Sequence, residues 1–188
     1  MITVVTGMGR SGTTLMMKIL HKSGINPYCD NFSSYETDKS ILLPTQHRWL
    51  ENCEGKVLKI LDPHIHTPPP NHVYSFIWMK RDLIEQAKSQ KKFLKACFPN
   101  MPFGSGWVKR CAKLNMKIQK QCLDILRQFN DNTLIVDFKD LLISPSDIIL
   151  KVHEYLNIDK SAVSLPNLIN IVDKRNYKCL SYLKEALP

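Results

Sequence analysis

The sequence predicts an α/β fold in which a mainly parallel sheet is covered by helices on both faces. Short apolar runs that suit strands alternate with segments whose apolar residues recur at helical spacing. The first apolar run leads directly into a glycine-containing loop and then into a helical pattern. The length of 188 residues suits one domain with a sizeable core, which we expect to cover residues 1–188.

The expected elements follow from these patterns in chain order. The four predicted strands are residues 2–5, 57–61, 73–79 and 133–136. Helices are expected over residues 13–22, 39–53, 107–129 and 146–157, with one more after Asp82 and a last one near the C-terminus. Pro44 falls inside the expected helix 39–53, and Ser146 is the expected N-cap of the helix 146–157. Ligands in such folds bind beyond the carboxyl ends of the strands, so residues 7–12, 62–66 and 80–82 are the candidate site segments.

The charge balance favours an anionic partner. Lysine and arginine exceed aspartate and glutamate by nine, which suits a nucleotide, a phosphorylated or sulfated substrate, nucleic acid or a membrane surface. The basic residues are scattered along the sequence, so neither a polybasic anchor nor a nucleic-acid platform is expected. No apolar run approaches the roughly 18–20 residues of a membrane span, and residues 1–6 show no signal peptide. The six cysteines lack C-x-x-C pairing, so we expect reduced thiols and a cytoplasmic protein.

The glycine loop is the strongest functional signal. Gly7 and Gly12 stand five residues apart between a strand and a helix, an arrangement that aims backbone N–H groups and a helix dipole at an anion. The spacing fits the first part of G-x-x-x-x-G-K-[ST], but Thr13 stands in the lysine position, while Thr14 keeps the hydroxyl. The loop is therefore predicted to bind phosphate in a manner different from that of an ordinary ATPase.

Residues 7–16, GMGRSGTTLM, resemble the 5′-phosphosulfate loop of the sulfotransferases, which use 3′-phosphoadenosine 5′-phosphosulfate (PAPS) and have a P-loop NTPase-like fold. RSGTTLM is most similar to the tyrosylprotein and bacterial members. The resemblance implies that Arg10 neutralises charge on the leaving group. It also implies a 5′-phosphate cradle formed by Gly9, Arg10, Ser11, Gly12, Thr13 and Thr14. Leu15 replaces the tryptophan of the cytosolic members, so the residue that stacks on adenine stays unassigned.

Two further segments are similar to this family. Arg81 at a strand end and Ser89 in the next helix resemble the pair that holds the 3′-phosphate, and a planar guanidinium beside a hydroxyl suits a terminal phosphate. Residues 136–145 resemble a structural segment of the family. Arg175, in the pair Lys174-Arg175, resembles the basic C-terminal stretch that reaches the 3′-phosphate, although a solvated charge pair is the alternative.

The acceptor proton needs a base, and the sequence leaves several candidates. Glu36 resembles an acidic position after the first helix in bacterial and tyrosylprotein members, and we expect it to be the base. A histidine has the better unperturbed pKa for this role, whereas a carboxylate needs burial. The alternatives to Glu36 are Asp30, Asp62, His64 and His66. Lys59 resembles a lysine near the site in bacterial members, with a strand-edge lysine as the other interpretation.

The resemblance predicts transfer of a sulfuryl group in line from PAPS to an acceptor hydroxyl or amine, leaving 3′,5′-ADP (PAP), with no metal. The acceptor itself has no recognisable motif. One alternative is a P-loop kinase or NTPase, in which residues 133–137 supply a strand and a magnesium-binding aspartate. The other is a non-catalytic protein that binds a nucleotide or another anion.

Overall fold

The computed structural model of the protein describes residues 1–43, 45–129, 133–159 and 163–172. Five parallel strands form one sheet in the order β2-β3-β1-β4-β5. Their bounds are β1 Ile2–Gly7, β2 Pro27–Tyr28, β3 Val57–Leu61, β4 Tyr74–Lys80 and β5 Leu134–Asp137. The predicted parallel α/β fold is confirmed, and the glycine loop leaves the sheet at its central strand.

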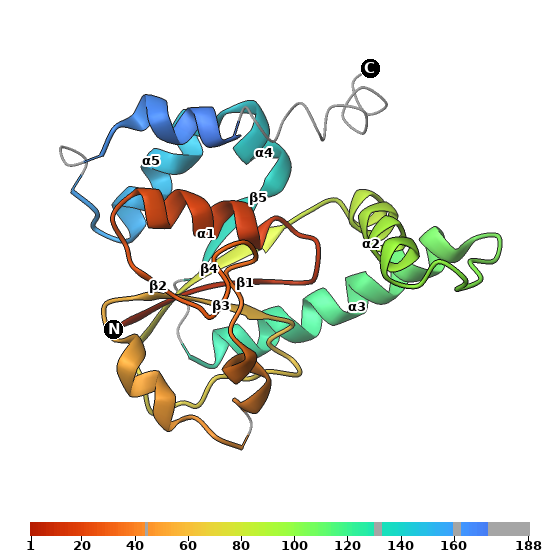
Figure 1. The fold of residues 1–188 in the computed structure, drawn as a ribbon, viewed down its shortest axis with the longest axis horizontal. Coiled ribbons are helices and arrows are strands. Elements are labelled where there is room, and N and C mark those ends of the chain that lie inside the picture. The colour runs from red at the N-terminus through yellow and green to blue at the C-terminus, as the bar shows by residue number, and fades with distance from the viewer. Residues whose placement is uncertain (44, 130–132, 160–162, 173–188) are drawn as a thin grey trace.

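Helices cover the sheet on both faces (Figure 1). The α-helices labelled in Figure 1 are α1 Thr13–Lys22, α2 Leu83–Cys97, α3 Trp107–Arg127, α4 Phe138–Ile143 and α5 Pro145–Tyr155. One buried cluster joins α1, α4 and α5 to the sheet, and residues 165–172, also helical, contribute to it. A second cluster joins the other face of the sheet to α3 and to residues 43–53. The three layers follow because parallel strands buried on both faces need cover on both.

The predicted helix over residues 39–53 is wrong. Two short 3-10 helices, Asp38–Leu42 and Arg48–Cys53, lie there instead. Proline 44 explains the break, because a proline has no N–H to donate and its ring clashes with the preceding helical turn. Leu50 and Cys53 are still buried against the sheet, so the segment covers its face without forming one helix.

The predicted cap at Ser146 is displaced by two residues. Ser144 occupies the N-cap position of α5 and Pro145 is in the first turn, where a missing N–H costs little. The preceding helix α4 was not expected, and the Asp137 carboxylate caps it by accepting from the backbone N–H of Lys139 at 2.9 Å. Arg175 and the rest of its basic stretch lie outside the described residues.

The α2–α3 pair carries much of the chain beyond the edge of the sheet (Figure 1). Ile84, Phe93 and Leu114, three apolar residues of these helices, are 40%, 49% and 56% exposed. Gln86 and Asn115 are buried instead. Within the described residues, no helix is long and apolar enough to cross a membrane.

Candidate phosphate-binding and active site

The glycine loop depends on the absence of two side chains. A Cβ on Gly7 would lie 2.6 Å from Ser11 Oγ and 2.8 Å from the Met79 carbonyl oxygen. Gly12 has φ 107°, and a Cβ there would overlap the Phe138 ring. Larger residues would therefore push the loop away from β4 and α4. The two glycines let the chain turn tightly, so that α1 begins at Thr13 with its N-terminus beyond the carboxyl end of the central strand β1.

Two glutamines of α2 hold the loop from outside. Gln86 and Gln90 donate from their Nε2 atoms to the Gly9 carbonyl oxygen at 2.9 and 3.2 Å. Asn115 of α3 donates to Gln90 Oε1 at 2.8 Å. Because a trans peptide points its C=O and N–H in opposite directions, this anchor turns the N–H of Arg10 away from α2. None of these three residues is predicted from the sequence, although glutamines four apart share one helix face and could have been found on that ground.

Arg10, Arg81 and Ser89 meet beside the loop. Arg10 has φ 72° and donates from Nε to Ser89 Oγ at 3.3 Å, with its guanidinium 5.3 Å from the centre of the Phe93 ring. Arg81 donates from Nη1 to the Arg10 carbonyl oxygen at 3.2 Å and lies 4.8 Å from the centre of the Phe138 ring. Arg81 Nε also lies 3.7 Å from Glu85 Oε2. Two guanidinium groups and a hydroxyl are thus linked by contacts through Arg10 near the end of β4, a set that suits a phosphate.

Lys59 supplies an ammonium group at the start of α1. Its side chain is 3% exposed and reaches from β3, next to β1, to three oxygens. The Lys59 Nζ atom lies 3.0 Å from Thr14 Oγ1, 2.9 Å from the Ser34 carbonyl oxygen and 2.7 Å from Glu36 Oε1. Thr13 stands where a P-loop has a lysine, and the Lys59 ammonium from the neighbouring strand β3 lies next to this position. Of the two interpretations of Lys59, this position fits a residue near the site.

The remaining loop hydroxyls are enclosed. Ser11 and Thr13 are 1% and 4% exposed, and the Ser11 hydroxyl has no hydrogen-bond partner among the described residues. Thr14 donates to the Ser34 carbonyl at 3.5 Å while accepting from Lys59. The segment around Ser34 thus closes against α1 on the side of the loop opposite α2.

The candidate bases sit in different surroundings. Glu36 is 52% exposed and ion-paired with Lys59. The Asp30 carboxylate accepts from the Thr37 hydroxyl at 2.6 Å and from the Asp38 N–H at 3.1 Å, and the Thr37 hydrogen bond lowers the pKa of Asp30. Its carboxylate is thereby a weaker base than an ordinary one.

Asp62, His64 and His66 follow β3. Burial raises the pKa of Asp62, although the histidines and a hydrogen bond from the Gly9 N–H oppose that rise. His64 Nδ1 lies 3.3 Å from Cys122 Sγ of α3. His66 Nδ1 is buried and has no partner among the described residues. Asp62 is thus the carboxylate in direct contact with the loop. Among the residues that the structure describes, no group of three or more His, Cys, Asp or Glu side chains could hold a metal ion.

Asp62→Asn is expected to raise the free energy of unfolding at neutral pH, because it removes a charge that burial disfavours. The raised pKa means that the folded state binds the proton more tightly, so wild-type stability falls as the pH rises through the Asp62 pKa. The free energy of unfolding that the variant gains over the wild type should therefore shrink as the pH is lowered through that pKa. Urea unfolding over a pH series measures the difference.

Asp30→Asn is the control of opposite sign. The Asp30 pKa is lowered, so its charged form stabilises the fold, and the variant should be less stable than the wild type at neutral pH. This difference should shrink as the pH falls, because the wild type then loses the contribution of the charged Asp30. A loss of stability for Asp62→Asn at neutral pH would contradict the assignment of Asp62 as a desolvated carboxyl.

Comparisons with known proteins give a fold and no sequence relative. No protein-family model matches the chain, and no curated protein sequence matches it. The structure is similar to that of a retinol dehydratase in complex with androsterone and inactive cofactor PAP, with TM-score 0.58 and 16% identity over 90% of this chain and 63% of that one. It is also similar to a sulfotransferase from Alicyclobacillus acidocaldarius, with TM-score 0.51 and 11% identity over 84% of this chain and 81% of that one. The chain thus spans less than two thirds of the length of the retinol dehydratase, and what it shares with both structures is the sulfotransferase fold.

Proposed function

We propose that this protein is a sulfotransferase that moves the sulfuryl group of PAPS to an acceptor hydroxyl or amine. The observation that carries the proposal is the meeting of Arg10, Arg81 and Ser89 next to the glycine loop. A nucleoside triphosphate has its phosphates in one chain at the 5′ position and needs no such second cluster. A nucleotide with a separate 3′-phosphate does.

Each group of the site then has a role in the reaction. The loop backbone and the N-terminus of α1 bind the 5′-phosphate, and Arg81 with Ser89 binds the 3′-phosphate. As the bond from sulfur to the 5′-phosphate oxygen breaks, the acceptor oxygen bonds to sulfur in line with it. Arg10 and Lys59 stabilise the charge that develops on the departing phosphate. Preorganised charges of this kind supply most of the rate in the related phosphoryl transfers.

Glu36 takes the proton of the acceptor in this scheme. Its carboxylate is reachable from solvent, and its ion pair with Lys59 holds it next to the start of α1. Asp62 is the second candidate, because burial raises the pKa of its carboxyl toward the working range of a general base. Asp62 contacts the loop at Gly9, whereas Glu36 is linked to Thr14 through Lys59.

Ligand-induced thermal shifts test the proposal. Addition of 3′,5′-ADP without magnesium is expected to raise the melting temperature, since a ligand that binds only the folded state stabilises it by mass action. ATP and GTP with magnesium are the comparison ligands. Stabilisation by these alone would replace the proposal with a kinase or NTPase, and binding of 3′,5′-ADP without sulfuryl transfer to any acceptor would favour the non-catalytic alternative.

Arg81→Ala is expected to weaken binding of 3′,5′-ADP by about 10- to 100-fold, the loss of a charge-assisted contact, and to change binding of 5′-AMP much less. Calorimetric titration of one protein preparation with both nucleotides gives the ratio of their dissociation constants. Partial unfolding of the variant affects both constants equally and cancels in this ratio. Arg127→Ala is the matched control, because Arg127 is an exposed arginine at the end of α3. Equal losses for the two nucleotides would remove Arg81 from the 3′-phosphate site.

A further inference from the structure

The excess positive charge of this chain lies on one hairpin. Residues 86–123, which span most of α2 and α3, contain nine lysine or arginine residues and no aspartate or glutamate. The net charge of the whole chain is +9, so the rest of the chain is balanced. The charge looks scattered along the sequence because the nine-residue loop 98–106 interrupts it. The two helices pack side by side and bring it together (Figure 1).

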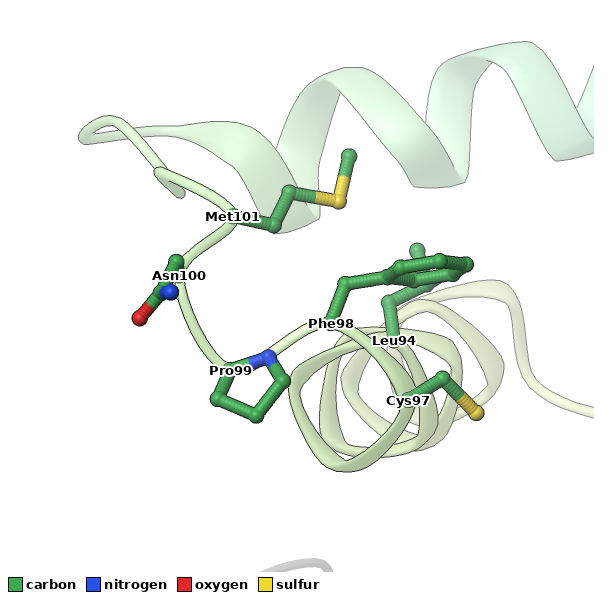
Figure 2. Close-up of a pocket in the computed structure, with 6 residues that line it drawn as sticks. All are labelled: Leu94, Cys97, Phe98, Pro99, Asn100 and Met101. Carbon is green, nitrogen blue, oxygen red and sulfur yellow. The ribbon is translucent and has the colours of Figure 1, made fainter.

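The tip of the hairpin is apolar. Phe98 and Met101, in the loop between α2 and α3, are 58% and 43% exposed. An open pocket of about 610 Å³ lies there, lined by Leu94, Cys97, Phe98, Pro99, Asn100 and Met101. Figure 2 shows the Phe98 ring above the end of α2, with the Met101 side chain on the facing side. These side chains cover no core of this chain, so their exposure needs another explanation.

Cations surround this tip. Lys91 and Lys95 place their Nζ atoms 5.5 and 5.9 Å from the centre of the Phe103 ring. Arg110 donates from Nη1 to the Ser105 carbonyl oxygen at 3.0 Å, at the start of α3. Lys92 is exposed on the same helix turn as Lys91 and Lys95. The hairpin therefore ends in an apolar patch with positive charges immediately behind it.

We propose that the α2–α3 hairpin docks on an anionic lipid surface, with Phe98 and Met101 in the interface and the lysines against the headgroups. Apolar side chains backed by lysine and arginine are the composition of segments that lie in a membrane interface. Anionic headgroups complement the charge, and hydrocarbon complements the tip without any demand for directional contacts. This inference does not depend on the proposed sulfuryl transfer.

The structure favours lipid over two other polyanions. A nucleic acid would stack its bases on a row of exposed aromatic rings. Of the aromatic residues in 98–107, only Phe98 is exposed, whereas Phe103 and Trp107 pack edge to face at 5.2 Å and are half-buried. An acidic polypeptide would satisfy the lysines and leave Phe98 and Met101 in water. Lipid accounts for the charge and the apolar tip together.

Co-sedimentation of the full chain with vesicles tests the proposal. Binding is expected with vesicles of phosphatidylcholine plus phosphatidylserine, not with phosphatidylcholine alone, and should weaken as salt is added. The substitutions K91E/K92E/K95E should lower partitioning at least tenfold, since each lysine near an anionic surface contributes roughly fivefold. F98S/M101S should also lower it at least tenfold, because it removes the apolar contact.

Two control variants make the same chemical changes elsewhere. K18E/K22E/K151E reverses three exposed lysines on α1 and α5, and F32S/I143S removes two exposed apolar side chains. Both should bind vesicles nearly as the wild type does, and thermal unfolding checks that every variant is folded. The proposal is overturned if anionic vesicles are not bound or if F98S/M101S binds as F32S/I143S does. It is also overturned if the hairpin variants lose binding to a single-stranded oligonucleotide or to polyglutamate but keep binding to vesicles.

Discussion

Replacing Lys59 by methionine is expected to lower the rate of sulfuryl transfer by about 10²–10³-fold, the effect of removing one preorganised group that stabilises transition-state charge. The Lys59 ammonium contacts Thr14 at the start of α1, where the proposed reaction develops charge on the departing phosphate. Methionine fills most of the same buried volume, so the sheet should stay packed. The loss should therefore appear in kcat more than in the affinity for 3′,5′-ADP.

Single-turnover transfer from PAPS, read beside calorimetric titration with 3′,5′-ADP, separates the two effects. Lys18→Met is the matched control, because Lys18 is an exposed lysine on α1. A Lys59→Met protein that turns over at the wild-type rate would make Lys59 a structural residue that only joins α1 to residues 34–36.

Glu36→Gln is the second change with a large expected effect, a loss of about 10²–10⁴-fold in turnover, the usual contribution of a general base. The amide keeps an oxygen that can accept from Lys59, so the geometry should survive while the proton acceptor is lost. Affinity for 3′,5′-ADP should change little. The measurement is the pH–rate profile of wild type and variant, with Glu51→Gln as a control at an exposed glutamate.

Asp62→Asn, compared in the same assay, distinguishes the two carboxylates. If Glu36→Gln retains turnover and Asp62→Asn loses it, the base is the carboxyl beside the Gly9 N–H and not the one beside Lys59.

The three central strands of the sheet, β3, β1 and β4, were predictable because they are buried on both faces. All six residues of β1 are buried, and a run of apolar residues is what such a strand requires. The glycine spacing likewise predicted the turn at Gly7 and Gly12. The prediction of one helix over residues 39–53 was wrong because the apolar residues there suit a helix, whereas Pro44 forbids a continuous one. Burial of Leu50 and Cys53 needs only the short turns that formed.

Contacts between segments distant in the chain could not be predicted from the sequence. Lys59 is itself buried among apolar residues of a strand, and only the pairing of β3 with β1 shows that its side chain ends beside Thr14. The anchoring of Gly9 by Gln86 and Gln90 depends on the direction in which α2 leaves β4, which no local pattern encodes. The clustering of charge on the hairpin depends in the same way on how α2 packs against α3.

The hydrogen bonds to the Gly9 carbonyl have a thermodynamic consequence. Gln86 belongs to α2, and Gln90 is held in turn by Asn115 of α3, so both arms of the hairpin act on one peptide unit of the glycine loop. Whatever shifts α2 against α3 must also change the free energy of the loop. Linkage between binding sites is reciprocal. An occupant of the hairpin and a nucleotide in the loop would then alter each other's affinity through an equal coupling free energy, carried by two glutamine side chains.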